Sequence, residues 1–247
     1  EPGVGKSTLL LSVAAQTAAK GIPALYISGE ESASQVRLRA ERINAVDPKL
    51  FLASETDLGA VIAHIDAVKP ELLIIDSVQT IGSSTADGSP GGVTQVREVA
   101  GALIRICKDR DITLLLVGHV TKDGSLAGPK VLEHMIDCSL MLEGSSDSQF
   151  RTLRSHKNRF GAVNELGVFA MTDKGLREVP NPSAIFLQRG EEVSSGSIVM
   201  VIWEGTRPLL VELQALVDDS HLGNPRRVTV GLDHNRLSML LAVLHRH

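Results

Sequence analysis

The stretch EPGVGKSTLLL, residues 1–11, decides the fold class of this 247-residue chain. It contains the second half of the phosphate-binding pattern G-x-x-x-x-G-K-[ST], whose first glycine would precede Glu1. In such a loop, backbone amides that no side chain obstructs point at phosphate groups, and the following helix adds its positive end. We therefore predict a nucleotide-binding loop rather than an ordinary glycine-rich turn before a helix.

Three side chains of the loop have expected roles. Lys6 would reach the β and γ phosphates, Ser7 a magnesium ion and Thr8 a further phosphate oxygen. The whole predicted binding set is one continuous segment: Pro2, Gly3, Val4, Gly5, Lys6, Ser7 and Thr8. Since the strand that feeds such a loop would also precede Glu1, we expect this sequence to be a window on a longer protein.

Composition limits the classes of partner. The net charge is -4, from 25 basic and 29 acidic residues, so contact with nucleic acid requires a local basic patch. No apolar run approaches the roughly 20 residues of a membrane span, and no signal peptide is visible. We expect a cytoplasmic protein with no membrane partner. Cys107 and Cys138 lie in apolar stretches, and we predict two buried thiols rather than metal ligands.

Short apolar runs alternate with helical patterns in the first part of the chain. The predicted strands are ALYISG at 24–29, ELLIID at 71–76, TLLLVGH at 113–119 and CSLMLEG at 138–144. The predicted helices are 7–20, 34–44 and 94–108. Runs of this length, bounded by turn residues, are typical of buried parallel strands, so we predict an α/β fold with helices on both faces of a mainly parallel sheet.

The pattern changes toward the C-terminus. FRTLRSHKNRFG at 150–161 alternates as an antiparallel strand does, and a hairpin is expected around residues 173–175. After VPNPSA at 179–184 come two further strand patterns and a closing helix at 235–247. We therefore predict two domains, 1–181 and 182–247.

Carboxylates follow two of the predicted strands. Asp76 ends the run LLIID and would hold the magnesium water shell, as a Walker B acid does. In YISGEES, Glu30 and Glu31 come directly after a strand, where a carboxylate can orient the attacking water; we predict Glu30 as the base and Glu31 as its helper. The alternative is that one of them caps the next helix, and both roles can coexist.

A polar residue and two lysines follow the next strand. His119 could sense the γ phosphate and pass its state to the loop, or it could be a histidine at the edge of the core. Lys122 and Lys130 lie in the glycine-rich loop that follows, which suits contact with a phosphate backbone. A solvated loop would have the same composition.

A cationic cluster occupies the later strand. Arg151, Arg154, His156, Lys157 and Arg159 crowd nine positions, and Lys157 and Arg159 share one strand face. No carboxylate alternates among them, so we expect an anion: nucleic acid, or the triphosphate of a neighbouring subunit approached as by an arginine finger. A basic edge strand that discourages aggregation is the alternative.

Together these stretches resemble the RecA-type ATPases, and most closely the bacterial RadA (Sms) family of DNA-repair proteins. The resemblance covers essentially the whole chain and rests on PGVGKSTLLL, YISGEES, LLIIDSVQT, SPGGVTQVRE, GHVTKDGSLAGPKVLEH and HKNRFGAVNELGVFAM. The last contains the family motif K-N-R-F-G: Lys157, Asn158, Arg159, Phe160 and Gly161. The resemblance to the family continues through GTRPLLVELQALV, NPRR and LDHNRLSMLLAVLHRH.

The resemblance implies a RecA-like core over residues 1–181 and a Mg²⁺-dependent, DNA-stimulated ATP hydrolase. It further implies a motor on single-stranded DNA that promotes branch migration of recombination intermediates, working as a hexameric ring in the bacterial cytoplasm. A recombinase or a replicative helicase is an expected partner. By the same analogy, Lys157 and Arg159 would reach the neighbour's ATP, and His119 would act as the sensor.

The resemblance also implies further contacts. The loops from Gln79 to Gln95 and from Val120 to Glu133 would line the central channel, with Lys122, Lys130 and Arg97 on DNA. Arg37, on the helix after the predicted base, is a candidate for contact with the nucleotide base.

Family members begin with a four-cysteine zinc finger, so zinc is expected only upstream of Glu1. They end in a domain similar to the Lon protease fold, whose first part residues 182–247 resemble; no proteolysis is expected. Two alternatives stay open: a replicative-type hexameric helicase of the same fold, and an ATP-gated assembly scaffold without motor activity.

Overall fold

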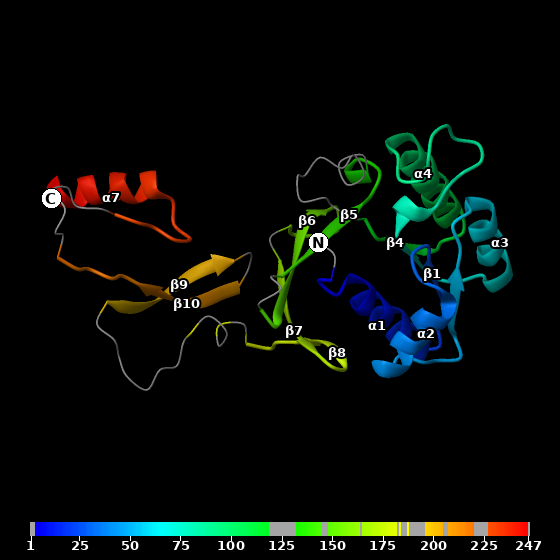
Figure 1. Cartoon of the computed structure of the whole chain (residues 1–247), viewed down its shortest axis with the longest axis horizontal. Coiled ribbons are helices and arrows are strands. Elements are labelled where there is room, and N and C mark those ends of the chain that lie inside the picture. The colour runs from blue at the N-terminus through cyan, green and yellow to red at the C-terminus, as the bar shows by residue number, and fades with distance from the viewer. Residues whose placement is uncertain are drawn as a thin grey trace.

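The structure is a computed structural model of the chain. It describes residues 3–118, 132–144, 148–163, 165–181, 183, 187, 196–204, 207–219 and 227–246. Figure 1 shows the chain running from the N-terminal α/β part to a hairpin and helix at the C-terminal end.

A four-stranded parallel sheet forms the centre of the first part. Its order is β2 (Leu50–Ser54), β1 (Ala24–Ser28), β3 (Leu72–Asp76), β4 (Thr113–Leu116). All five residues of β1 and all five of β3 are buried. Because these strands are covered on both faces, their sequences are continuous apolar runs, and the predicted α/β class is confirmed.

Helices cover both faces of this sheet. The helices α1 (Lys6–Ala19) and α2 (Ala33–Arg42) pack on one face, and α3 (Leu58–Val68) and α4 (Val93–Asp109) pack on the other (Figure 1). A short 3₁₀ helix, η1 (Val78–Thr80), follows β3. Consecutive positions of one strand therefore belong to different cores. Tyr26 contributes to the α1/α2 side and Ile27 to the α3/α4 side.

The sequence predictions did not include β2 or α3. Only one of the five residues of β2 is buried, because this strand lies at the edge of the sheet. Its apolar run, Leu50 to Ala53, is correspondingly weak as a strand signal. The sequence of α3 begins after Asp57, whose side chain accepts a hydrogen bond from the amide of Ala60 and so caps the helix.

A second sheet is antiparallel, in the order β5 (Cys138–Glu143), β6 (Phe150–Asn158), β7 (Leu166–Thr172), β8 (Gly175–Glu178). The predicted hairpin is confirmed, with Thr172 paired to Gly175. The prediction that 138–144 is a parallel strand was wrong, because β5 pairs antiparallel with β6. An apolar run is compatible with either sheet, and only its long-range pairing decides between them.

The prediction that both cysteines are buried was half wrong. Cys107 is buried in α4 beneath the sheet, whereas Cys138 is exposed. Cys138 begins β5, at the edge of the antiparallel sheet, where alternate residues face solvent.

The C-terminal elements are the hairpin β9 (Ser197–Glu204) with β10 (Arg207–Gln214), and the helix α7 (His234–Arg246). The sequence predicted all three. Leu209 of β10 packs with Leu166 and Val168 of β7, which joins the hairpin to the second sheet. The predicted boundary at residue 182 lies outside the described residues.

Candidate nucleotide-binding and catalytic site

The predicted phosphate loop has the geometry of an anion site. Gly5, with φ of 100°, is the left-handed N-cap of α1, and Gly3 also has a positive φ, of 78°. A side chain at Gly5 would be strained by this φ, and its Cβ would lie 2.6 Å from Cε of Met171. The amides of the first turn of α1 follow directly, where a helix end attracts anions.

The carboxyl ends of β1 and β3 lie side by side next to this loop. Ser28 pairs with Asp76 in the parallel register, and Asp76 is only 5% exposed. The phenol of Tyr26 donates a hydrogen bond to Oδ2 of Asp76 at 2.5 Å, and the Ser7 side chain lies close enough to the same phenol to influence its pKa. Tyr26 therefore links the two residues that the sequence predicted as magnesium ligands.

These residues fit a magnesium ion. Mg²⁺ prefers oxygen ligands and retains several waters, and a buried carboxylate beside a loop hydroxyl supplies such oxygens. The phenol of Tyr26 stays protonated as a donor, because burial and then the charge of Asp76 raise its pKa.

Lys6 lies among the predicted acids. Burial lowers its pKa, while the nearby carboxylates of Asp76 and Glu30 act in the opposite direction. Its Nζ also lies 3.5 Å from the carbonyl oxygen of Gly118, two residues after the end of β4 (Thr113–Leu116). The fold thus brings together the lysine, the predicted Walker B acid and the predicted base, which are separated by up to 70 positions in the sequence.

Glu30 and Glu31 have different partners. The Ser77 hydroxyl donates to Oε1 of Glu30 at 2.9 Å, which places this carboxylate beside the end of β3. The carboxylate of Glu31 pairs instead with the guanidinium of Arg39 on α2. This difference agrees with Glu30 as the group nearer the phosphate loop.

The alternative that a glutamate caps α2 was wrong. The N-cap is Ser32, whose side chain accepts from the amide of Gln35 while the Gln35 side chain accepts from the Ser32 amide. This capping box satisfies the helix start without either carboxylate.

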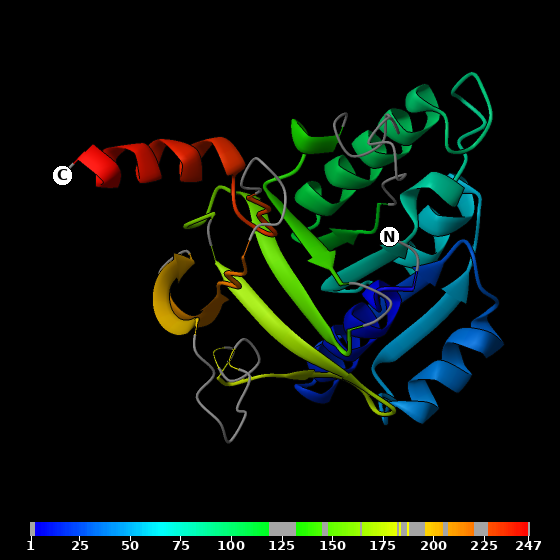
Figure 2. The same ribbon diagram turned by 60° about the vertical axis from the view of Figure 1, so that its left-hand side comes forward.

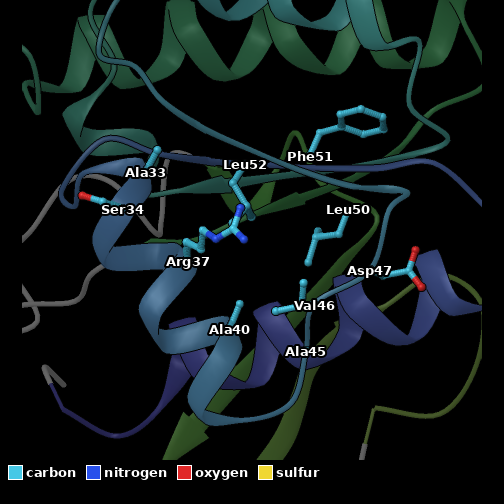
Figure 3. A pocket seen from close by; sticks show the side chains of 10 residues that line it. All are labelled: Ala33, Ser34, Arg37, Ala40, Ala45, Val46, Asp47, Leu50, Phe51 and Leu52. Atoms are coloured by element: carbon cyan, nitrogen blue, oxygen red, sulfur yellow. The ribbon is translucent and has the colours of Figure 1, made fainter.

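Arg37 lines an open cavity of about 410 Å³ between α2 and the segment that leads into β2 (Figure 3). The lining residues are Ala33, Ser34, Arg37, Ala40, Ala45, Val46, Asp47, Leu50, Phe51 and Leu52. Arg37 makes an exposed ion pair with Glu41 one turn along the helix, at 3.0 Å. Its contact with a nucleotide base stays a prediction.

The cationic end of β6 is held by the segment before β5. Nζ of Lys157 donates to the carbonyl oxygens of Glu133 and, at 2.7 Å, Ile136. Arg159 makes an ion pair with Asp137 at 2.9 Å. The sequence argument that no carboxylate neutralises these cations was incomplete, because the acid comes from the neighbouring segment and not from the strand itself.

The turn after β6 exposes an aromatic ring. Phe160 is 82% exposed, and its amide donates to the Asn158 side chain at 3.0 Å. The Asn158 amide group in turn donates to the carbonyl of Ala162 at 3.3 Å. The K-N-R-F-G motif thus begins in β6, at Lys157 and Asn158, and continues into a braced turn that ends at Gly161.

Four predicted site residues lie outside the described residues: Pro2, His119, Lys122 and Lys130. Arg97 is exposed on the first turns of α4, at the end of the predicted channel loop. That loop is held by Gln95, which is buried and donates to the carbonyls of Ser83, Ala86 and Gly88.

Sequence reasoning missed the supporting roles of three polar residues, Tyr26, Gln95 and Arg151, and placed Arg151 only in the cationic cluster. Tyr26 is the only tyrosine of the chain and interrupts an otherwise aliphatic strand, which is a signal of a buried hydroxyl with a partner. For Gln95 and Arg151 the sequence has no comparable signal.

A glycine-rich loop at a helix start, a buried acid at the end of the neighbouring strand and a positioned carboxylate on a parallel sheet are the features of a P-loop ATPase. A family model described as an AAA domain matches residues 1–125. The chain belongs to this family.

Matches to individual proteins identify the family more narrowly than the domain model does. The chain is 62% identical over 246 residues to the DNA repair protein RadA of Haemophilus influenzae, 61% identical to that of Escherichia coli and 49% identical to that of Bacillus subtilis. Each match covers 100% of this chain and 53–54% of the relative, so the chain spans about half the length of these relatives. The resemblance to the RadA family is confirmed.

Solved structures confirm the RecA-like fold. One solved structure, described as an ATPase domain, aligns with a TM-score of 0.61 at 14% identity, over 72% of this chain and 82% of that one. A KaiC-like protein from Pyrococcus horikoshii aligns with a TM-score of 0.55 at 18% identity, over 72% and 86%. None of the helices in the described ranges is long and apolar enough to cross a membrane.

Proposed function

We propose that this chain is the ATP-hydrolysing part of a DNA-dependent motor that promotes branch migration in homologous recombination and DNA repair. One observation supports turnover above all others. The carboxylate of Glu30, held by Ser77, lies close enough to the Lys6 ammonium to influence its pKa. A switch that only binds nucleotide has no need of a carboxylate held beside the phosphate-binding lysine.

In this proposal the chain's own residues divide the work. The amides from Gly3 to Thr8 bind the phosphates, and Lys6 neutralises charge on the β and γ groups. Glu30 orients the attacking water and accepts its proton, while Glu31 fixes the start of α2 through Arg39. Ser7 and Asp76 would hold Mg²⁺, which would neutralise the charge that develops on the transferred phosphate.

The outer residues carry the coupling to DNA and to other subunits. Lys157 and Arg159 would exchange their contacts with residues 133–137 for the nucleotide of a neighbouring subunit in a hexameric ring. His119 would report the γ phosphate to the loop that carries Lys122 and Lys130. Single-stranded DNA would lie on this loop, on the segment 79–95 and on Arg97.

The name of the relatives, DNA repair protein RadA, supports a role in DNA repair, and recombination intermediates as the substrate are part of our proposal. Residues 1–181 would form the RecA-like domain, and 182–247 the start of a Lon-protease-like domain that supports assembly. A cytoplasmic location, and a recombinase or replicative helicase as partner, belong to the same proposal.

The test is the ATPase rate with and without single-stranded DNA, in the full-length protein. We expect DNA to stimulate the wild type, and Glu30→Gln to bind nucleotide but not to hydrolyse it. Lys157→Ala should lose the stimulation. Absence of stimulation, together with a Lys157→Ala variant that matches wild type, would exclude a motor and favour the ATP-gated scaffold.

A mixing experiment tests the shared site. Lys157→Ala rings are expected to lose the DNA-stimulated ATPase and Lys6→Ala rings all ATPase, and mixed rings should recover part of the stimulated rate. A ring in which each subunit works alone would show no recovery at any ratio.

A further inference from the structure

A buried arginine joins the second sheet to the phosphate loop. Arg151, near the start of β6, is only 8% exposed. Its Nε donates to the carbonyl oxygen of Val4 at 3.2 Å, across 147 positions of sequence. Its Nη1 donates to the carbonyl oxygens of Ser148 and Phe150, at 2.5 and 2.8 Å.

The surroundings of Arg151 are shaped for this contact. A Cβ at Gly144 would lie 2.3 Å from Cδ of Arg151, so the residue that follows β5 leaves room for the arginine stem. A buried charge is costly unless its donors are satisfied, and here the guanidinium donates to three backbone carbonyls. A lysine carries all its donors on one nitrogen, so it could not reach the Val4 carbonyl from one atom and those of Ser148 and Phe150 from another, as the guanidinium does.

Other contacts from the same sheet reach the loop. A side chain at Gly5 would meet Met171 of β7 and, at 3.5 Å, Leu176 of β8. The turn at Gly175 lies against Thr8. In Figure 1 and Figure 2 the second sheet lies beside the N-terminal end of α1, and β8 packs against this helix, so the second sheet is a support for the phosphate loop.

The same strand carries the motif cations. β6 is paired on both sides, with β5 and β7, which stiffens it. From Arg151 to Lys157 it rises about 20 Å, at roughly 3.3 Å a residue. One end of β6 therefore touches this chain's phosphate loop, and the other carries the K-N-R-F-G motif.

We propose that Arg151 is a positioning residue that fixes the phosphate loop through Val4 and couples nucleotide binding to the K-N-R-F-G end of β6. This rests on the proposed function in that the loop binds nucleotide. When nucleotide orders the loop, the Val4 carbonyl is held in place and β6 is held with it. The cations at the other end then respond to the occupancy of their own subunit's site as well as to that of the neighbour.

The first experiment measures the affinity of the full-length protein for fluorescently labelled ADP with Mg²⁺. We expect Arg151→Met to weaken binding at least tenfold and Arg151→Lys to restore it in part. Arg177→Met is the matched control, since Arg177 is an exposed arginine on β8 of the same sheet and has no part in the proposed site. It should change the affinity less than twofold. An arginine with a purely structural role would lower the melting temperature but leave the affinity of the folded protein unchanged.

The second experiment follows hydrogen exchange in the wild type, with and without ADP. We expect protection of the amides of residues 3–8 and also of 155–161, and the second effect should vanish in Arg151→Met. Unchanged affinity in folded Arg151→Met, or no change of exchange at 155–161 in the wild type, overturns the inference. Failure of the wild type to bind ADP at all would instead overturn the proposed function, so the two failures are distinguishable.

Discussion

The replacement Tyr26→Phe removes one hydroxyl from the centre of the site. The ring is fully buried against the α1/α2 core, so phenylalanine keeps the packing. What is lost is the donor to Oδ2 of Asp76 and the link to the Ser7 side chain.

The size of the effect follows from the acceptor. A hydrogen bond to a charged group contributes about 1.5–3 kcal/mol, which corresponds to roughly 10- to 150-fold in an equilibrium constant. Asp76 is buried, so solvent replaces the lost donor poorly. We expect the free energy of unfolding to fall by about 1–3 kcal/mol. The Mg²⁺ concentration for half-maximal nucleotide binding should rise about tenfold or more, because the Asp76 carboxylate is no longer oriented.

The assay titrates Mg²⁺ at a fixed concentration of labelled ADP, and urea unfolding of the same samples gives the stability. Thr17→Val is the control, because it removes an exposed hydroxyl that donates to the Val13 carbonyl on α1. A Tyr26→Phe variant with wild-type stability and a Mg²⁺ midpoint within twofold of wild type would refute the reasoning. Lower stability with an unchanged Mg²⁺ midpoint would reduce Tyr26 to a packing residue.

Two further predictions concern single side chains. Lys6→Ala should abolish the rise in melting temperature that nucleotide causes, yet leave the nucleotide-free protein about as stable, since burial already disfavours the lysine charge; a retained nucleotide shift would contradict this. At pH 8 a disulfide reagent should modify exposed Cys138 quickly and Cys107 only as the protein unfolds, because burial raises the pKa of Cys107 to about 11. The folded pKa exceeds the ordinary value of 9.0, so the Cys107 contribution to stability should be complete below pH 9 and lost as the pH rises through 11; equal labelling rates would contradict the burial.

The sequence by itself determined the features that depend on local geometry. Gly3 and Gly5 indicate a loop that needs positive φ, and the structure has both. The apolar run that ends in Asp76 indicates a buried strand with a carboxylate at its end. The hairpin at residues 173–175 and the antiparallel β6 follow from alternation and turn residues. Each of these signals involves only residues that are close in sequence, so a short segment is enough to predict it.

Only the tertiary structure decided which distant groups meet. The Tyr26–Asp76 bond spans 50 positions and the Arg151–Val4 bond spans 147. The pairing of β5 with β6 likewise makes β5 part of the antiparallel sheet and places Asp137 beside Arg159. Such contacts depend on strand order and on which face of a strand is covered, and no local pattern encodes either. Short motifs in the sequence thus predict the phosphate loop, Asp76 and Glu30. The contacts that hold these groups in place depend on how the two sheets pack.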